Sequence, residues 1–253
     1  MTDALVPLVN SLGFDTTHFE FFTAPDGVPS INNEEDAAKS AQACLPVLTT
    51  QLKNYDAFLV CCYSHHPLVS QLRQALEEEE EEKEGNPLLP KNKPVTGIFE
   101  ASIATCIQSI NMSHKFGIVS TGSQWEQILS EAVSTILGSS DSSNETSSPY
   151  STTRYAGCQT TGLNADELHT TPPAEVRLRM KNATKKLLRN GNAGGGGAVK
   201  AIALGCAGMA GMDAIVREAC VEELGEREGR GVKIVDGVVA GVVFLEGALR
   251  SGL

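Results

Sequence analysis

The chain has 253 residues, of which 41% are hydrophobic and 20% charged, and its formal charge at pH 7 is −11. This composition is typical of a globular protein, and the acidic balance argues against a nucleic-acid partner, whose phosphates need a basic surface. No run approaches the roughly 18 apolar residues that span a bilayer, and no basic segment precedes the first apolar residues. We therefore expect a cytoplasmic protein that makes no contact with a membrane.

Predicted helices and strands alternate along the chain. Helical periodicity is expected over residues 2–12, 33–53, 67–80, 100–110, 123–138, 174–190 and 208–224. Short apolar runs typical of buried strands lie at residues 57–62, 94–99, 116–120, 199–206 and 232–235. Residues 81–93 and 139–153 are expected to be loops, and the basic cluster at 176–189 the exposed face of an amphipathic helix. Strands that alternate with helices predict an α/β fold with parallel sheets.

Seven cysteines lie at positions 44, 61, 62, 106, 158, 206 and 220. An odd number without an export signal argues against a disulfide framework. The run "CCYSHH" contains metal-ligating side chains, but the chain has no C-x-x-C pair and its other histidines lack ligand spacing, so we predict no metal. Five of the cysteines are expected to pack in the interior as small apolar side chains: Cys44, Cys61, Cys106, Cys158 and Cys220.

The remaining two cysteines, Cys62 and Cys206, end predicted strands in the same way. "AFLVCCYSHHPL" and "AIALGCAGMAGM" both read as strand, cysteine, short turn and helix. Ligands of parallel sheets bind beyond the carboxyl ends of the strands, and a helix N-terminus there lowers the pKa of a thiol. Two such thiols on opposite faces of a carbon acid could remove and return a proton, which inverts a stereocentre without a cofactor. The glycines around Cys206 would let backbone amides approach an enolate oxygen.

The segments "DAFLVCCYSHHPL", "PVTGIFEAS", "FGIVSTGSQW" and "AIALGCAGM" resemble the signature segments of the hydantoin/allantoin racemase family, within the aspartate/glutamate racemase superfamily. The resemblance covers nearly the whole chain, and residues 27–38 and 160–169 are similar to the fungal branch. It implies two lobes, each a parallel sheet flanked by helices, with the active site between them. We accordingly expect residues 1–94 plus 219–253 in the first lobe and 95–218 in the second.

Carried over position by position, the resemblance implies that Cys62 and Cys206 are the catalytic acid/base pair and that no cofactor is needed. The residues expected to bind substrate through hydroxyls, turn amides and pocket walls are Ser30, Ile31, Ser64, Ser120, Thr121, Ala207 and Gly208. His65 or His66 could shape the pocket. Glu100 is either a supporting group or only a carboxylate at a helix start.

The first strand of the family, with its Asn-containing turn, has no counterpart ahead of Met1, so we expect the first sheet to lack that strand. We predict a racemase acting on a hydantoin or allantoin type substrate, or on an amino acid. The alternatives are a catalytically impaired or non-enzymatic binding or regulatory member, and a related isomerase or decarboxylase. The retained pair of thiols argues against a decarboxylase. The expected partner is a small-molecule substrate, and the sequence leaves a homo-oligomer open.

Overall fold

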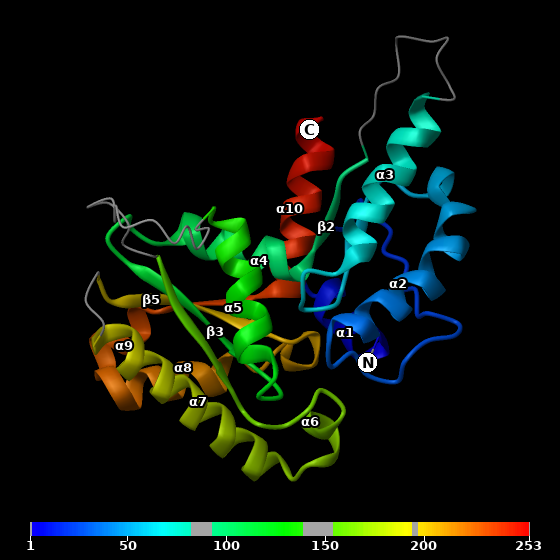
Figure 1. Cartoon of the computed structure of the whole chain (residues 1–253). Helices are drawn as coiled ribbons and strands as arrows, with labels where there is room; N and C mark the ends of the chain where they lie inside the picture. The colour runs from blue at the N-terminus through cyan, green and yellow to red at the C-terminus, as the bar shows by residue number, and fades with distance from the viewer. Residues whose placement is uncertain (1, 82–92, 139–153, 194–196, 253) are drawn as a thin grey trace, which may run out of the picture. The chain divides into compact units, whose positions relative to one another are not determined.

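The computed structural model describes residues 2–81, 93–138, 154–193 and 197–252. The loops expected at 81–93 and 139–153 fall almost entirely outside these residues. The chain divides into two compact units, one formed by residues 1–101 and 238–253 and the other by residues 102–237. Both units contain parallel strands joined through helices, so the predicted α/β class is confirmed (Figure 1).

The first unit holds a two-stranded parallel sheet. Strand β1 (Phe58–Val60) pairs with β2 (Val95–Gly97), with Phe58 opposite Val95 and Val60 opposite Gly97. Its helical elements are α1 (Thr2–Asn10), α2 (Glu34–Thr49), η1 (Leu52–Asn54), α3 (Pro67–Glu81), the first turn of α4 (Ile98–Ser109), and α10 (Gly237–Ser251) from Val238 on.

The core of the first unit forms where α2 and α3 pack on this sheet. Ala41 and Leu48 of α2 meet Leu72 of α3 and the strand residues Phe58 and Val95 in one buried cluster. The side chain of Asn33 caps α2 by accepting the N–H of Asp36, and Pro67 opens α3, as its fixed φ favours. These local signals fix where the two helices begin, and therefore which of their faces the sheet buries.

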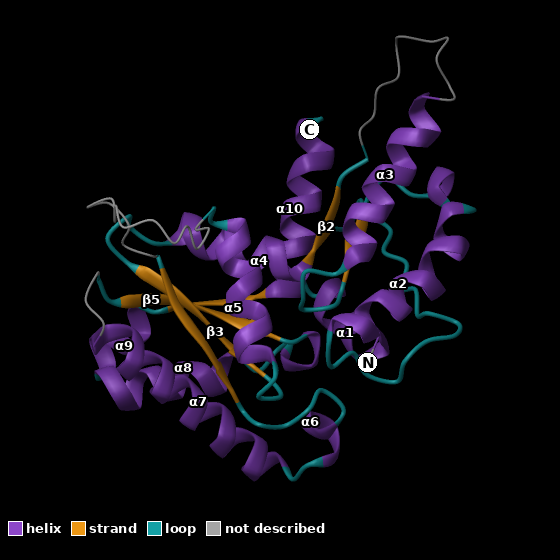
Figure 2. Cartoon of the chain, in the orientation of Figure 1, coloured by secondary structure: helices purple, strands orange, loops and turns teal. Residues whose placement is uncertain are grey.

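The second unit is a four-stranded parallel sheet in the order β4-β3-β5-β6. The strands are β3 (Lys115–Ser120), β4 (Tyr155–Thr160), β5 (Val199–Gly205) and β6 (Lys233–Asp236). Its helical elements are the rest of α4, α5 (Trp125–Ile136), α6 (Glu167–Thr170), α7 (Pro173–Ala193), η2 (Ala207–Met209), α8 (Asp213–Leu224) and α9 (Glu226–Gly231). Helices α7 and α8 cover one face of the sheet and α5 the other (Figure 2).

Two features of the second unit differ from the sequence-based expectation. Strand β4 was not predicted, because "YAGCQT" is half-buried at an edge and has no continuous apolar run. The sequence placed residues 219–253 in the first lobe, whereas β6 pairs with β5 and the chain belongs to the second unit up to Gly237. The in-register pairing of Ile202 with Ile234 makes β6 part of this sheet.

The basic cluster of α7 faces the carboxylates of α8. Lys185 lies 2.7 Å from Glu222, which also pairs with Lys181, and Arg189 lies 2.6 Å from Glu223. Hydrogen bonds from Lys181 and Lys185 lower the pKa of Glu222 to about 2. The basic residues of α7 therefore form an ion-paired seam between two helices.

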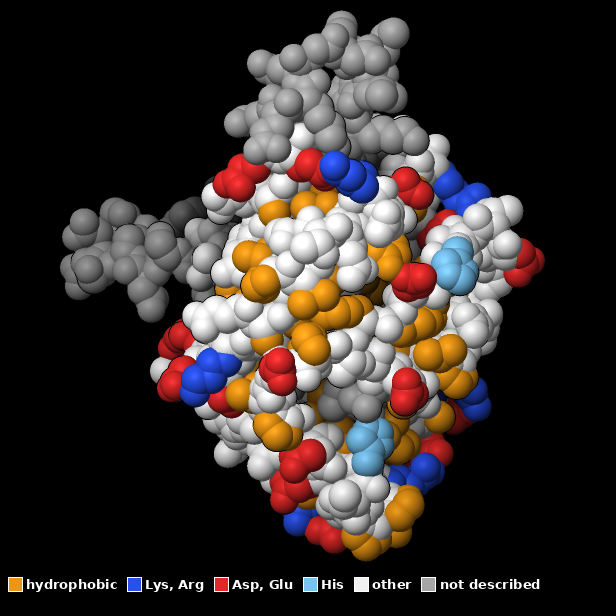
Figure 3. Space-filling model, turned by 90° about the vertical axis from the view of Figure 1, so that its right-hand side faces the viewer, with side chains coloured by type: hydrophobic (Ala, Val, Ile, Leu, Met, Phe, Trp, Pro, Cys, Tyr) orange, Lys and Arg blue, Asp and Glu red, His pale blue; other side chains and the backbone are white. Residues whose placement is uncertain are grey.

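Side chains of both charges are interspersed on the face of the molecule that Figure 3 draws. Figure 3 shows apolar side chains near the middle of this face, with Asp, Glu, Lys and Arg side chains around them. Among the described residues, none of the helices is both long and apolar enough to cross a membrane.

Replacing Leu187 tests the packing of the second unit. Leu187 is fully buried, and its Cδ1 occupies the space above Gly117, 2.7 Å from where a Cβ would stand. Leu187→Ala should lower the free energy of unfolding by about 2–5 kcal/mol, because it leaves a cavity between α7 and β3. Leu178→Ala, on the exposed side of the same helix, should change it by less than about 0.5 kcal/mol. Urea unfolding measures both, and equal effects would contradict this packing.

Candidate active site

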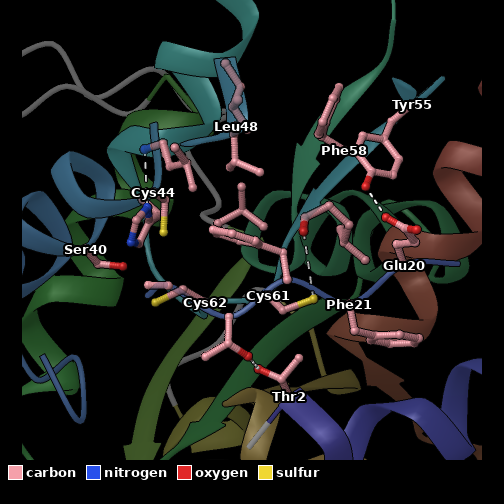
Figure 4. A pocket seen from close by; sticks show the side chains of 18 of the residues that line it. Thr2, Glu20, Phe21, Ser40, Cys44, Leu48, Tyr55, Phe58, Cys61 and Cys62 are labelled. Atoms are coloured by element: carbon pink, nitrogen blue, oxygen red, sulfur yellow. Dashed lines mark hydrogen bonds between the residues drawn. The ribbon is translucent and has the colours of Figure 1, made fainter. Parts of the chain in front are cut away.

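A cavity of about 430 Å³ lies in the first unit beside β1. One wall is formed by six consecutive residues, 57–62, and another by residues 20–24, and Cys44 and Leu48 of α2 also line the cavity (Figure 4). Successive strand residues point to opposite faces, so a wall of consecutive residues is the edge of a strand. The cavity therefore runs along the edge of β1 that faces away from β2.

Cys62 lies at the carboxyl end of this wall. Its side chain is half-buried, its sulfur is 3.4 Å from the hydroxyl oxygen of Ser64, and it shares the cavity lining with Ile31. Figure 4 shows it on the side of Ser40 and Cys44. Ser30 is outside the lining, but its Oγ is buried and has no hydrogen-bond partner among the described residues. The structure thus brings Cys62, Ser64 and Ile31 together, with an unsatisfied hydroxyl one residue away.

The expectation that Cys61 packs in the core is wrong. Cys61 is exposed and lines the same cavity as Cys62, pointing toward Phe21 (Figure 4). The reason is that the edge of β1 beside Cys61 borders the cavity instead of another described strand. The expected burial is confirmed for the other four cysteines, Cys44, Cys106, Cys158 and Cys220.

The two histidines after Cys62 have different environments. His66 is 3% exposed and lines the cavity, and its Nδ1 accepts the N–H of Leu68. Burial lowers the pKa of His66 to about 4, so the imidazole is neutral at pH 7. His65 is exposed and lies 3.4 Å from Glu100, which belongs to the first turn of α4. Glu100 therefore lies at a helix start, as one of the two expectations for it has it, and its carboxylate lies near His65.

In the second unit, the predicted site residues gather at the carboxyl ends of β3 and β5. Ser120 stands opposite Gly205 in the sheet, and its hydroxyl donates a 2.6 Å hydrogen bond to the Gly205 carbonyl. A Cβ at Gly205 would lie 2.7 Å from the Cβ of Ser120, so only glycine fits. Thr121 is buried, and its carbonyl accepts the hydroxyl of Thr161. The hydrogen bond between Ser120 and Gly205 joins the ends of β3 and β5, and it sets the start of the turn that follows β5.

Cys206 begins that turn. Its sulfur accepts the N–H of Gly208 at 3.3 Å, and Ala207 and Gly208 are buried in the η2 turn. Burial raises the pKa of the Cys206 thiol, and the N–H groups of Gly208 and Met209 oppose that rise. The expected lowering of this pKa is not found, because burial outweighs the backbone N–H groups, and the helix that would supply a dipole, α8, begins only at Asp213.

His169 is a residue of this region that the sequence did not single out. A Cβ at Gly208 would lie 3.5 Å from the sulfur of Cys206 and 3.5 Å from Nε2 of His169. Both side chains therefore border the space above one glycine. His169 lies on α6, which follows the edge strand β4. Because the sequence did not predict β4, it did not predict that His169 lies near the end of the sheet. Within the described ranges, no group of three or more Cys, His, Asp or Glu side chains could hold a metal ion.

Comparison with known proteins identifies the family. A family model described as Asp/Glu/Hydantoin racemase matches residues 1–245. The chain belongs to the Asp/Glu/hydantoin racemase family. This agrees with the resemblance seen in the signature segments, and it makes a racemase of this type the activity class of the chain.

Individual proteins that are similar to this chain extend the comparison. An uncharacterized protein of Schizosaccharomyces pombe is 30% identical over all of this chain and 88% of its own length. The crystal structure of an allantoin racemase from Pseudomonas fluorescens has a TM-score of 0.68 at 22% identity, covering all of this chain and 86% of that one. An allantoin racemase from Klebsiella pneumoniae has a TM-score of 0.65 at 22% identity, with 100% and 83% coverage. These structures share the fold.

The low pKa of His66 predicts a pH-dependent stability. The imidazole has a pKa of about 4 in the fold and 6.5 when unfolded, so the unfolded chain binds the proton more tightly. The stabilisation is fully present above pH 6.5 and should be lost as the pH falls from 6.5 to 4, by up to about 3 kcal/mol.

His66→Asn can keep an acceptor for Leu68 without titrating. Unfolding free energies measured between pH 4 and 7.5 should fall less steeply for this variant than for the wild type. The same substitution at His18, whose side chain is 87% exposed, should leave the slope unchanged. Parallel curves for His66→Asn and the wild type would show that His66 is not the group responsible.

Proposed function

We propose that the chain is a cofactor-independent racemase that inverts a carbon acid by 1,1-proton transfer between Cys62 and Cys206. The observation that carries this proposal is the matched placement of two partly buried thiols. Each follows the carboxyl end of a parallel strand, one in each compact unit, and each begins a turn beside a hydroxyl or an amide. The proposal requires that both sulfurs reach opposite faces of one carbon.

The chemistry conserves protons over one turnover. One cysteine, as thiolate, takes the proton from the carbon next to a carbonyl, and the electron pair of that C–H bond moves toward the carbonyl oxygen. The other cysteine, as thiol, delivers its proton to the opposite face of the carbon. The product is the mirror-image stereocentre, and the two sulfurs have exchanged protonation states. Thiols suit both roles because their pKa of about 8.5 lies close enough to neutral pH to be tuned.

The residues around the thiols divide into binding and positioning roles. The amide of Ala207 and the hydroxyl of Thr121 are the groups we assign to the enolate oxygen, since hydrogen bonds that strengthen as charge develops lower the barrier. The hydroxyl of Ser120 already donates to Gly205, so we assign it to holding the turn. On the other side, Ser64 contacts Cys62. Ser30 and Ile31 would contact the remainder of the substrate.

Allantoin or a 5-substituted hydantoin is the substrate class we favour, with an amino acid as the second choice. Both solved structures compared above are allantoin racemases by name. The apolar cavity beside Cys62 suits a carbon substituent, because burying it there releases water from apolar walls. We infer no cofactor for this reaction, and a cytoplasmic location with a small molecule as the partner.

The second candidate function is a non-catalytic binding or regulatory protein. The cavity along the outer edge of β1 favours it, because the described residues place no strand there to support Cys62 from that side. A related isomerase would share the thiol pair and differ only in the substrate. The test below separates proton transfer from binding.

Proton NMR in D₂O tests the proposed reaction. With the wild-type protein, the proton at the stereocentre of allantoin or a 5-substituted hydantoin should be replaced by deuterium while optical rotation decays. Cys62→Ser and Cys206→Ser should each slow racemisation by at least about 100-fold, because a serine hydroxyl cannot serve as the acid/base at neutral pH.

Cys61→Ser is the matched control for this experiment. It changes the adjacent thiol on the same cavity and should keep racemisation within a few-fold of the wild type. If Cys62→Ser and Cys206→Ser also retain full activity, the two-cysteine mechanism is wrong. A wild-type protein that is stabilised by a hydantoin but exchanges no deuterium would instead support the binding function.

A further inference from the structure

The turn after β5 brings an exposed imidazole and a shielded thiol to the same small space, within about 7 Å of each other. Nε2 of His169 and Sγ of Cys206 each lie 3.5 Å from the position of an absent Cβ at Gly208. Cys206 is only partly accessible, whereas His169 is exposed on α6. The imidazole therefore reaches from solvent to the space that the sulfur also borders.

We propose that His169 is a positioning residue that exchanges the proton of Cys206 with water and holds its thiolate as an ion pair. This proposal rests on the proposed function, because it concerns how one of the two catalytic thiols loses and regains its proton. The proton passes from Sγ to the imidazole nitrogen, which gives a thiolate and an imidazolium, and the imidazolium then releases the proton to water. The reverse sequence restores the thiol, so no other reactant is needed.

The buried thiol of Cys206 loses its proton less readily than an exposed thiol. Burial raises the pKa of the Cys206 thiol, and the N–H groups of Gly208 and Met209 offset only part of this. A nearby imidazolium is a common way to stabilise a cysteine thiolate, and imidazole changes charge between pH 5 and 8. After each transfer from carbon the sulfur must lose its new proton, and an exposed base shortens that path.

The other charged groups around the turn cannot replace His169. Glu167 on α6 accepts the N–H of Asn164, and Asp236 at the end of β6 accepts the N–H of Gly211. Arg179 on α7 is paired with Glu175. The further carboxylates on these elements, Asp166 before α6 and Asp213 at the start of α8, are exposed. A carboxylate disfavours a neighbouring thiolate, so His169 is the group here that can favour it by gaining a proton.

The test is the pH profile of alkylation at Cys206, measured with iodoacetamide and mass spectrometry of the peptide that contains it. His169→Gln should move the midpoint up by about one pH unit and slow the reaction at pH 7 about tenfold, with the plateau at high pH unchanged. The exposed thiol of Cys61 is an internal control whose profile should not move. His114→Gln, in the turn before β3, is the matched control variant and should behave as the wild type.

Gly208→Ala provides a second variant that keeps both side chains. Its methyl group fits at ordinary contact distance from both the sulfur and the imidazole and takes up space that both of them border, so the midpoint should again rise. A midpoint in His169→Gln within 0.2 units of the wild type, or a Cys206 that resists alkylation at every pH, would overturn the inference. If the pH profile of Cys206 alkylation shifts but the protein exchanges no deuterium into substrate, only the racemase function is overturned. If the profile does not shift and racemisation is full, only the role of His169 is overturned.

Discussion

The hydrogen bond from the Gly208 amide to the sulfur of Cys206 is the interaction on which the second half of the candidate site depends. A thiol in this place is penalised by burial when it ionises, and backbone N–H groups supply compensation that needs no charged neighbour. The contact exists because the chain turns immediately after β5, so that the amide two residues on points back at the side chain. The imidazole of His169 borders the space above the same glycine. The chemistry of Cys206 thus follows from the backbone path after a strand.

That path is fixed by the sheet. Ser120 and Gly205 are paired at the carboxyl ends of two neighbouring parallel strands, and the hydroxyl of one holds the carbonyl of the other. Buried hydrogen bonds of this kind are costly to leave unmade, so they define one geometry for the turn. In the first unit the corresponding strand end is less enclosed. Cys62 is supported by Ser64, while the outer edge of β1 borders a cavity. The two halves of the proposed site therefore differ in how firmly they are held.

Sequence patterns predicted the parts of the molecule that depend on continuous burial. The apolar runs around Phe58, Ile118 and Ile202 are strands, and Pro67 opens a helix as expected. The edge strand at Tyr155–Thr160 was missed, because an edge needs no apolar run, and with it the place of His169. Cys61 is exposed because the edge of β1 beside it borders a cavity instead of another described strand. The pKa of Cys206 is raised because the thiol is buried, and α8 begins several residues after it. No local pattern reports the helix that starts at Asp213 instead of Gly208.

The central claim is that two thiols from different compact units act on one carbon. Each must approach that carbon within about 3–3.5 Å from opposite sides, so the sulfurs should lie about 6–7 Å apart when substrate is bound. Treatment of a Cys61→Ser protein with a short thiol–thiol crosslinker of that span, followed by peptide mass spectrometry, measures this directly. The account predicts an intramolecular link between Cys62 and Cys206 that substrate suppresses. Single modification of both thiols without any such link would contradict it.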